Sequence, residues 1–238
     1  LEFRRVLFRS LNPVDKHAIE AAVAVKDAIG GTVTILTMGN ALAGEMMRDG
    51  IAIGADKGVL VSDERMAGSD TLATGLVLAK AIEKLGGADL VFTGKRSTDG
   101  DTGQIPPAIA QRLGMALISY ANSVSVDGTT VTATRLNHDG IETVQAQLPA
   151  VVSVTEKSNT PRSPKIRGKM AAKKAVFDVW KVEDLGLDAA SVGKSGSATK
   201  VTELFAPEPN PVGVMIEGAT PADAAANLVK ELTAKNLL

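Results

Sequence analysis

The stretch ADLVFTGKRSTDGDTGQIPPAIAQRLG, residues 88–114, decides the fold. Its apolar run at 90–92 predicts a buried strand. Its second half predicts a helix that begins close to Pro106 and Pro107, because proline is tolerated in the first turn of a helix. The segment between them is rich in Gly, Thr and Asp, which predicts a loop. A strand, a polar loop and a helix in this order are typical of an α/β protein with a parallel sheet.

Helical and strand periodicity alternate upstream of this stretch as well. Helices are expected at 15–31, 42–56 and 69–87, a fully buried strand at 32–38, and a further strand at 58–63. Asp15 is expected to cap the first helix, and Ser69 or Asp70 the third. The predicted strands end in Met-Gly, Ser-Asp or Thr-Gly, so small polar residues gather along one edge of the sheet. Open parallel sheets bind ligands beyond the carboxyl ends of their strands.

The alternation of predicted helices and strands ends after Leu113. Residues 123–148 alternate between apolar and polar, with Asp-Gly turn signals at 127–128 and 139–140, and therefore predict antiparallel strands. Residues 149–155 predict one further buried strand. The fold class is α/β, with an open, mostly parallel sheet, helices on both faces, and antiparallel strands at one side.

Three regions are expected along the chain. Residues 1–10 do not continue the pattern and lack an initiator Met, so we expect a non-native leader, with an amphipathic targeting peptide as the alternative. Residues 11–156 are expected to form the α/β nucleotide-binding domain. Residues 157–238 are rich in Pro, Gly, Ser and Lys, and we expect an extended arm that packs on another surface.

Composition excludes several classes of function. The chain has no cysteine, which excludes disulfides, thiolate metal sites and thiol nucleophiles. A net charge of −1 gives no overall attraction to nucleic acid, and no apolar run approaches the roughly 18 residues of a membrane-spanning helix. Neither His17 nor His138 is paired with a nucleophile, and no residues have metal-ligand spacing. A bound cofactor would have to supply any chemistry.

The polar loop has the composition of a phosphate-binding segment. The unpaired amides at 103–105 would form a cradle at the start of a helix. Lys95 or Arg96 would add charge, while Asp99 and Asp101 would cap backbone amides or contact ribose hydroxyls. The loop matches neither G-x-G-x-x-G nor the P-loop. The alternative is an irregular turn before a capped helix.

A basic segment follows at 161–174, with six Lys or Arg and no acid. It is either a solvated basic face or an electrostatic docking loop with Ile166 or Met170 as its apolar anchor.

Several stretches, taken in order, resemble the beta (small) subunit of electron-transfer flavoproteins. They are LNPVDKHAIEAA, IAIGADKGVLV, SDTLATGLVLAKAI, DLVFTGKRSTDGDTGQIPPAIAQRLG, PAVVSVTEKSNTPRSPKIRGKMAAKK, DLGLD and GSATKV. Each is weak alone, but their order and spacing are specific. The resemblance implies an adenine-nucleotide-binding, Rossmann-like fold whose first native strand is missing from this chain.

The resemblance also implies an electron carrier without side-chain catalysis. Such a subunit pairs with a larger alpha subunit, shares FAD with it, and itself holds AMP or a second FAD. The flavin takes electrons from dehydrogenases, such as the acyl-CoA dehydrogenases of fatty acid oxidation, and passes them to a quinone reductase. The compartment would be the cytoplasm of a bacterium, or the mitochondrial matrix of a eukaryote.

The resemblance assigns two sets of residues. The cofactor-binding set is Asn12, Pro13, Val14, Asp15, Met38, Gly94, Lys95, Arg96, Ser97, Thr98, Asp99, Gly100, Asp101, Thr102, Gly103 and Gln104. The set for recognition of partner dehydrogenases is Pro164, Lys165, Ile166, Arg167, Gly168 and Met170.

The sequence leaves two other functions open. A stand-alone adenine-nucleotide-binding regulatory module of the stress-protein type would use the same sheet edge, although it has no use for a long arm. A hydrolase on an α/β sheet has less support, because no nucleophile and base have a recognisable spacing.

Overall fold

The computed structural model of the chain describes residues 11–98, 100–203, 205–206, 208–210 and 212–238. Its contacts divide the chain into two compact units, of which the first ends at Lys200 and the second is Val201–Leu238. Residues 157–200, which the sequence grouped with the arm, therefore belong to the first unit. The expected leader and Asp99 lie outside the described residues.

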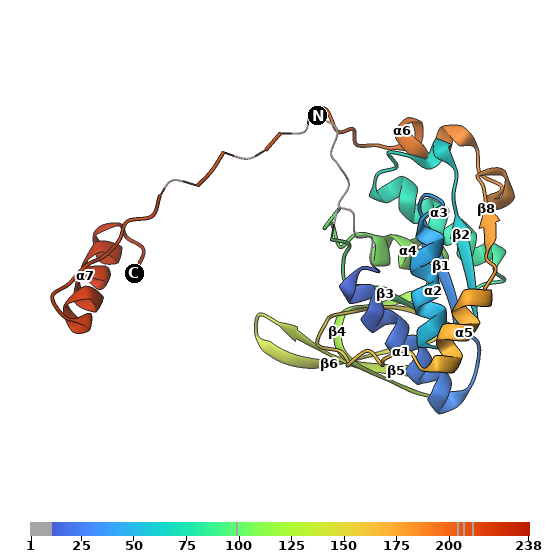
Figure 1. Ribbon diagram of the computed structural model, residues 1–238, viewed down its shortest axis with the longest axis horizontal. Helices are drawn as coiled ribbons and strands as arrows, with labels where there is room; N and C mark the ends of the chain where they lie inside the picture. The colour runs from blue at the N-terminus through green and yellow to red at the C-terminus, as the bar shows by residue number, and fades with distance from the viewer. Residues whose placement is uncertain (1–10, 99, 204, 207, 211) are drawn as a thin grey trace. The chain divides into compact units, whose positions relative to one another are not determined.

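The predicted helices and strands are present (Figure 1). The helices are α1 (Pro13–Ile29), α2 (Ala43–Ile53), α3 (Thr71–Lys84), α4 (Ile105–Leu113), α5 (Ile166–Lys174), α6 (Gly193–Gly196) and α7 (Pro221–Ala234). The strands are β1 (Thr34–Met38), β2 (Lys57–Val61), β3 (Leu90–Gly94), β4 (Ala116–Asp127), β5 (Thr130–Asn137), β6 (Gly140–Gln147), β7 (Ala150–Val154) and β8 (Asp178–Trp180). Short 3-10 turns are η1 (Glu64–Met66), η2 (Glu183–Leu185) and η3 (Ala189–Ser191). None of the described helices is long and apolar enough to cross a bilayer.

The strands form two sheets, with the orders β1-β2-β8 and β3-β7-β4-β5-β6. The pairs β1–β2, β2–β8, β3–β7 and β7–β4 are parallel, whereas β4–β5 and β5–β6 are antiparallel. Strand β4 changes partner along its length, from β7 at its start to β5 at its end. The α/β class with a mostly parallel sheet and antiparallel strands at one side is confirmed.

Strand β7 explains why helices cover both faces of its sheet. All five of its residues are buried. Ala150, Val152 and Val154 pack in one apolar cluster with residues of α1, while Val151 packs with Ile109 of α4 on the opposite face. Because successive side chains of a strand point to opposite faces, a strand buried on both sides reads as a continuous apolar run.

Strand β1 differs from its expectation, because none of its residues is fully buried. Its apolar side chains still divide between two faces. Ile35 packs with the cluster around Ile51 of α2, and Leu36 and Met38 pack with the cluster around Val77 of α3. In the described part of the chain β1 pairs only with β2, which explains its partial exposure.

The start of α1 also differs from the prediction. The helix begins at Pro13, and its N-cap is Asn12, whose side chain makes no capping hydrogen bond. Asp15 lies inside the first turn and does not cap the helix. The prediction for α3 is confirmed, because the carboxylate of Asp70 accepts a hydrogen bond from the Ala73 amide at 3.0 Å.

Residues 157–200 return to the α/β unit through several local contacts. Figure 1 shows α5 beside α2 and β8 beside β2. Arg48 of α2 donates to the carbonyls of Ala172 and Ala175 at the end of α5. Arg162 makes a bidentate ion pair with Glu20 of α1. These polar contacts join segments that are far apart in the sequence.

Candidate nucleotide-binding site

The start of α1 meets the carboxyl end of β3 at one edge of the sheet. The Gly94 amide donates to Asp15 Oδ1 at 2.9 Å. The Asn12 side-chain amide donates to Asp15 Oδ2 at 3.0 Å and to the Arg96 carbonyl at 3.1 Å. The structure thus brings together two pairs of predicted residues, Asn12 with Asp15 and Gly94 with Arg96, and the two pairs are about 80 positions apart in the sequence.

Gly94 is required by this close approach. A Cβ atom at this position would lie 2.5 Å from Asp15 Oδ1 and 3.2 Å from both the Asp15 nitrogen and the Val14 carbonyl carbon. The predicted residues Pro13 and Val14 therefore contribute their backbone, which forms the first turn of α1 against the strand end.

Asp15 is a carboxyl group in an unfavourable position for a negative charge. Burial raises the pKa of Asp15 above its ordinary value, while the hydrogen bonds from Asn12 and Gly94 oppose that rise. Burial therefore weakens the preference of this side chain for the charged form.

Ion pairs and a hydrogen bond hold the side chains of loop 94–104. Lys95 pairs with Glu156 at 2.8 Å, and Arg96 pairs with Asp101 at 2.9 Å. The Ser97 hydroxyl accepts from the Gly100 amide at 3.2 Å. Both cations that were expected to supply free positive charge are thus paired with acids. Thr98 and Thr102 are exposed, and the expected role of Asp99 falls outside the described residues.

The start of α4 leaves backbone donors available. Gln104 is its N-cap, and the Gln104 amide lies 3.4 Å from Thr102 Oγ1. Across the described residues, the amides of Gly103 and Ile105 donate no hydrogen bond. The Gln104 side chain accepts from the Thr71 hydroxyl at 2.8 Å, which ties the starts of α3 and α4 together.

Two buried oxygens at this edge have no hydrogen-bond partner, namely Asn12 Oδ1 and Thr93 Oγ1. Buried polar atoms are nearly always paired, so an unpaired one marks a place for a ligand or a water molecule. Thr93 is the residue before Gly94 and is not among the residues that the sequence predicts to bind a cofactor. Its strand position was visible in the sequence, but its unpaired state depends on neighbours from other strands.

Other residues that the sequence singles out lie away from the contacts at Gly94. Met38 packs with the apolar cluster of the first sheet around Val61 and Val77, apart from the contacts at Gly94. His17 pairs with Asn159 through Nδ1 at 3.0 Å. No group of His, Asp or Glu within the described ranges could hold a metal ion.

The predicted docking loop is a helix. Lys165 is the N-cap of α5, and Pro164 and Arg167 are exposed. Ile166 is 80% exposed and Met170 is 57% exposed, four residues apart on one helical face. Gly168 faces the other way, since a Cβ there would lie 2.3 Å from the Ala52 carbonyl oxygen of α2.

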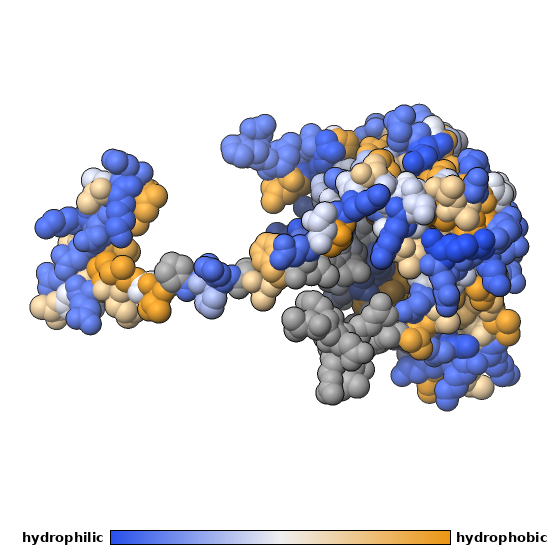
Figure 2. Space-filling model, turned by 90° about the horizontal axis from the view of Figure 1, so that it is seen from above, coloured by the Kyte–Doolittle hydropathy of each residue, from blue (hydrophilic) through white to orange (hydrophobic). Residues whose placement is uncertain are grey.

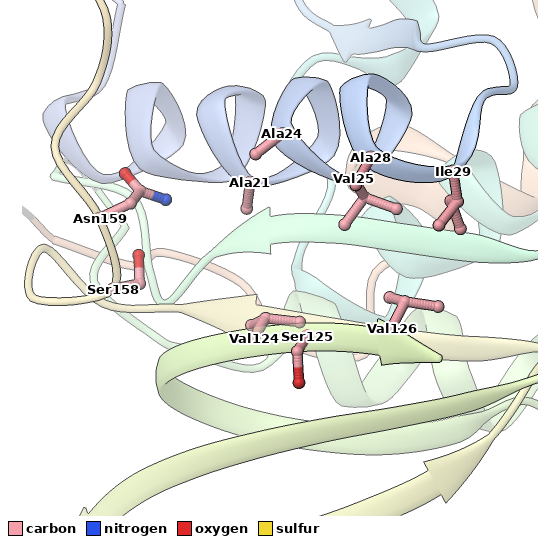
Figure 3. Close-up of a pocket in the computed structure, with 10 residues that line it drawn as sticks. All are labelled: Ala21, Ala24, Val25, Ala28, Ile29, Val124, Ser125, Val126, Ser158 and Asn159. Carbon is pink, nitrogen blue, oxygen red and sulfur yellow. The ribbon is translucent and has the colours of Figure 1, made fainter. Parts of the chain in front are cut away.

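An apolar groove of about 280 Å³ lies between α1 and β4 (Figure 3). The residues that line it are Ala21, Ala24, Val25, Ala28, Ile29, Val124, Ser125, Val126, Ser158 and Asn159. It includes none of the residues that the sequence assigned to cofactor or partner binding.

Comparisons with known proteins agree with this architecture. The electron transfer flavoprotein domain matches residues 7–185. The chain is 38% identical over 229 residues to subunit CarD of the caffeyl-CoA reductase-Etf complex of Acetobacterium woodii, covering 96% of this chain and 87% of the relative. It is 40% identical over 213 residues to the electron transfer flavoprotein subunit beta of Megasphaera elsdenii, covering 87% and 79%. Protein FixA of Bradyrhizobium diazoefficiens is 40% identical over 205 residues, covering 83% and 71%. The chain belongs to the electron-transfer flavoprotein beta (small) subunit family.

Proposed function

We propose that this chain is the beta subunit of a heterodimeric electron-transfer flavoprotein. It carries electrons from dehydrogenases, such as acyl-CoA dehydrogenases, through FAD to a quinone reductase or another acceptor. Loop 94–104 and the start of α1 bind AMP or a second FAD. One observation carries this proposal: unpaired buried oxygens and free backbone amides lie together at the carboxyl edge of a parallel sheet.

The residues at this edge fit a nucleotide. The amides of Gly103 and Ile105 face no competing acceptor in the described chain and suit a phosphate at the start of α4. The unpaired oxygens of Asn12 and Thr93 suit the hydroxyl or amino donors of a nucleoside. Bound FAD supplies the electron-accepting group, while the chain binds and orients it without side-chain catalysis.

The proposed alpha-subunit contact is supported by the second compact unit. Large apolar side chains of this unit are exposed in isolation (Figure 2). Phe205 is 79% exposed, Val212 97% and Met215 84%. Large apolar side chains that are exposed in this number favour a protein partner that covers them. Transient docking of dehydrogenases is assigned to the exposed face of α5.

The proposal is tested by co-expressing the chain with an alpha subunit and counting flavin and AMP in the purified product. A yellow heterodimer that releases flavin, with AMP or additional FAD, supports the carrier. A colourless homodimer that binds ATP would instead support the stand-alone regulatory module. The readouts are the visible absorption spectrum and chromatography of the released nucleotides.

A further inference from the structure

Tyr120 has an unusual backbone conformation for an aromatic residue. Its φ is +59°, although it lies within β4. Asp101 and Asn236 are the other described non-glycine residues with positive φ, and Asp and Asn tolerate the left-handed region better than Tyr does. Such outliers persist where the surrounding structure fixes them, and they concentrate at binding sites.

A β-bulge fixes this conformation. Pairing of β4 with β7 shifts register between Ile118 and Ala121. Within that interval the Tyr120 amide donates to the hydroxyl of Ser153 at 3.0 Å. Ser153 is 2% exposed, so this acceptor is buried in the central strand. Bulges redirect side chains next to functional sites.

The redirected side chain reaches the start of α4. A Cβ on Gly103 would lie 2.9 Å from the Tyr120 hydroxyl oxygen, so this hydroxyl is adjacent to the Gly103 backbone. Tyr120 is 46% exposed. Among the described residues its hydroxyl has no hydrogen-bond partner. A free donor therefore lies beside Gly103, whose own amide donates no hydrogen bond within the described chain.

The groups around the Tyr120 hydroxyl favour binding of an anion by uncharged hydrogen-bond donors. Thr93 of β3 is the register partner of Ser153 of β7, and the Ser153 hydroxyl accepts from the Tyr120 amide. The unpaired Thr93 hydroxyl therefore lies on the strand next to β7. Lys95 is paired with Glu156 and Arg96 with Asp101. With both cations engaged by carboxylates, uncharged O–H and N–H donors remain to bind phosphate.

We propose that Tyr120 is a phosphate-binding residue, whose hydroxyl donates a hydrogen bond to a phosphate oxygen of the nucleotide held by loop 94–104. This inference rests on the proposed function, because it assigns a further contact to the same nucleotide. The strained bulge is then the device that brings an aromatic donor from β4 to the start of α4.

The test compares nucleotides with their phosphate-free forms in the nucleotide-stripped heterodimer. By calorimetry, Tyr120→Phe should weaken AMP binding about tenfold, the scale of a lost hydrogen bond to a charged group. The same substitution should leave adenosine binding unchanged. For FAD as occupant, the phosphate-free comparison is with both riboflavin and adenosine, and Tyr120→Phe should weaken binding of FAD but of neither fragment. Unfolding of wild type and Tyr120→Phe is measured in parallel.

A second readout needs no variant. The chain contains one Tyr, so isotope labelling of tyrosine gives a signal from a single side chain of this subunit. AMP should shift that signal and adenosine should leave it in place. This measurement decides the question even if Tyr120→Phe fails to fold.

The outcomes separate the inference from the proposed function. If AMP binds wild type and Tyr120→Phe equally well, the phosphate contact is refuted while the proposed function stands. If Tyr120→Phe weakens AMP and adenosine to the same extent, the hydroxyl acts on the nucleoside or on the local fold, and the phosphate contact is again refuted. If the heterodimer takes up neither AMP nor FAD, both proposals are overturned.

Discussion

Gly94 is the residue at which the sheet and the first helix touch. Its amide is the donor to Asp15, and its missing side chain is what allows the donor to approach. The same carboxylate also accepts from Asn12, which in turn reaches the Arg96 carbonyl. One glycine therefore sets the position of a helix start and of the loop that follows the strand.

Substitution of Gly94 by Ala should disturb this contact. The new Cβ would lie 2.5 Å from Asp15 Oδ1, so the carboxylate or the first turn of α1 must move. We expect a loss of about 1–3 kcal/mol in the free energy of unfolding, measured by urea titration. The matched control is Gly44→Ala in α2, where a Cβ meets no atom within 4 Å. The control should be neutral or slightly stabilising, because Ala is the better helix former. Equal effects of the two substitutions would show that the contact has no energetic role.

Asp63 makes the stability of the chain depend on pH. Its side chain is 7% exposed, and its carboxylate accepts from Arg65 and from the Val182 amide. The hydrogen bonds from Arg65 hold the pKa of Asp63 well below its ordinary value of 3.8. The ionised carboxylate therefore stabilises the fold above that ordinary value, and this contribution is lost as pH falls toward the lower pKa of the folded state.

The variant Asp63→Asn should be less stable than wild type by about 1–3 kcal/mol at neutral pH, because it weakens charge-assisted hydrogen bonds. The difference should shrink on acidification through the window below pH 3.8. Urea titrations of both proteins across that range provide the measurement. A difference that stays constant with pH would mean that the effect is steric and not electrostatic.

At the scale of elements, the sequence was most informative where a strand or helix is set by its own pattern. The apolar run of β7 predicts a buried strand, and the Ser69-Asp70 pair predicts the start of α3. Patterning was less informative where distant segments decide the outcome. Strand β8 has three residues and forms against β2, and α5 packs on α2 through Gly168. Neither partner can be read from local periodicity.

In the candidate site, too, the sequence predicted the local features and missed those that depend on distant segments. Its loop was visible in the sequence as a polar segment between a strand and a helix with proline in its first turn. The unpaired state of Thr93 and the bulge at Tyr120 were not visible, because they arise from register with β7. Likewise, Asp15 reads as a helix cap locally, yet its carboxylate accepts from a strand 79 positions away.

Helix α5 offers a test of the proposed docking face. Substitution of Ile166 by Ala removes most of an apolar side chain that is 80% exposed, so it should leave folding intact. Electron transfer from a dehydrogenase to the heterodimer should slow several-fold, measured by stopped-flow flavin absorbance, if this side chain is an anchor. Ile141→Ala on β6 is the matched control, since Ile141 is 77% exposed and lies on another element. Unchanged transfer by the Ile166 variant would remove α5 from the docking surface.

At the scale of the whole molecule, the chain combines an α/β unit that has its own hydrophobic core with a second unit whose large apolar side chains are exposed. Helix α7, of 14 residues, is the helix that the described part of the second unit contains, and a capping box between Thr220 and Asp223 caps its start. A capped helix of this length is marginal without tertiary packing. Leu228 and Val229 of α7 are 45% and 54% exposed. Burial of these side chains against another protein would supply the missing packing energy.

Truncation after Lys200 separates the roles of the two units. The α/β unit retains its core clusters, which lie within residues 18–192, and it keeps the contact between Thr199 and Asp70. We therefore expect thermal unfolding of the truncated chain to match that of the full chain measured without its partner. Co-purification with the alpha subunit should be lost, because the exposed apolar side chains of the second unit are removed. The full-length variant Leu228→Asp with Val229→Asp keeps the chain length constant and should weaken association in the same direction. A truncated chain that still holds the alpha subunit at full strength would show that the contact belongs to the α/β unit.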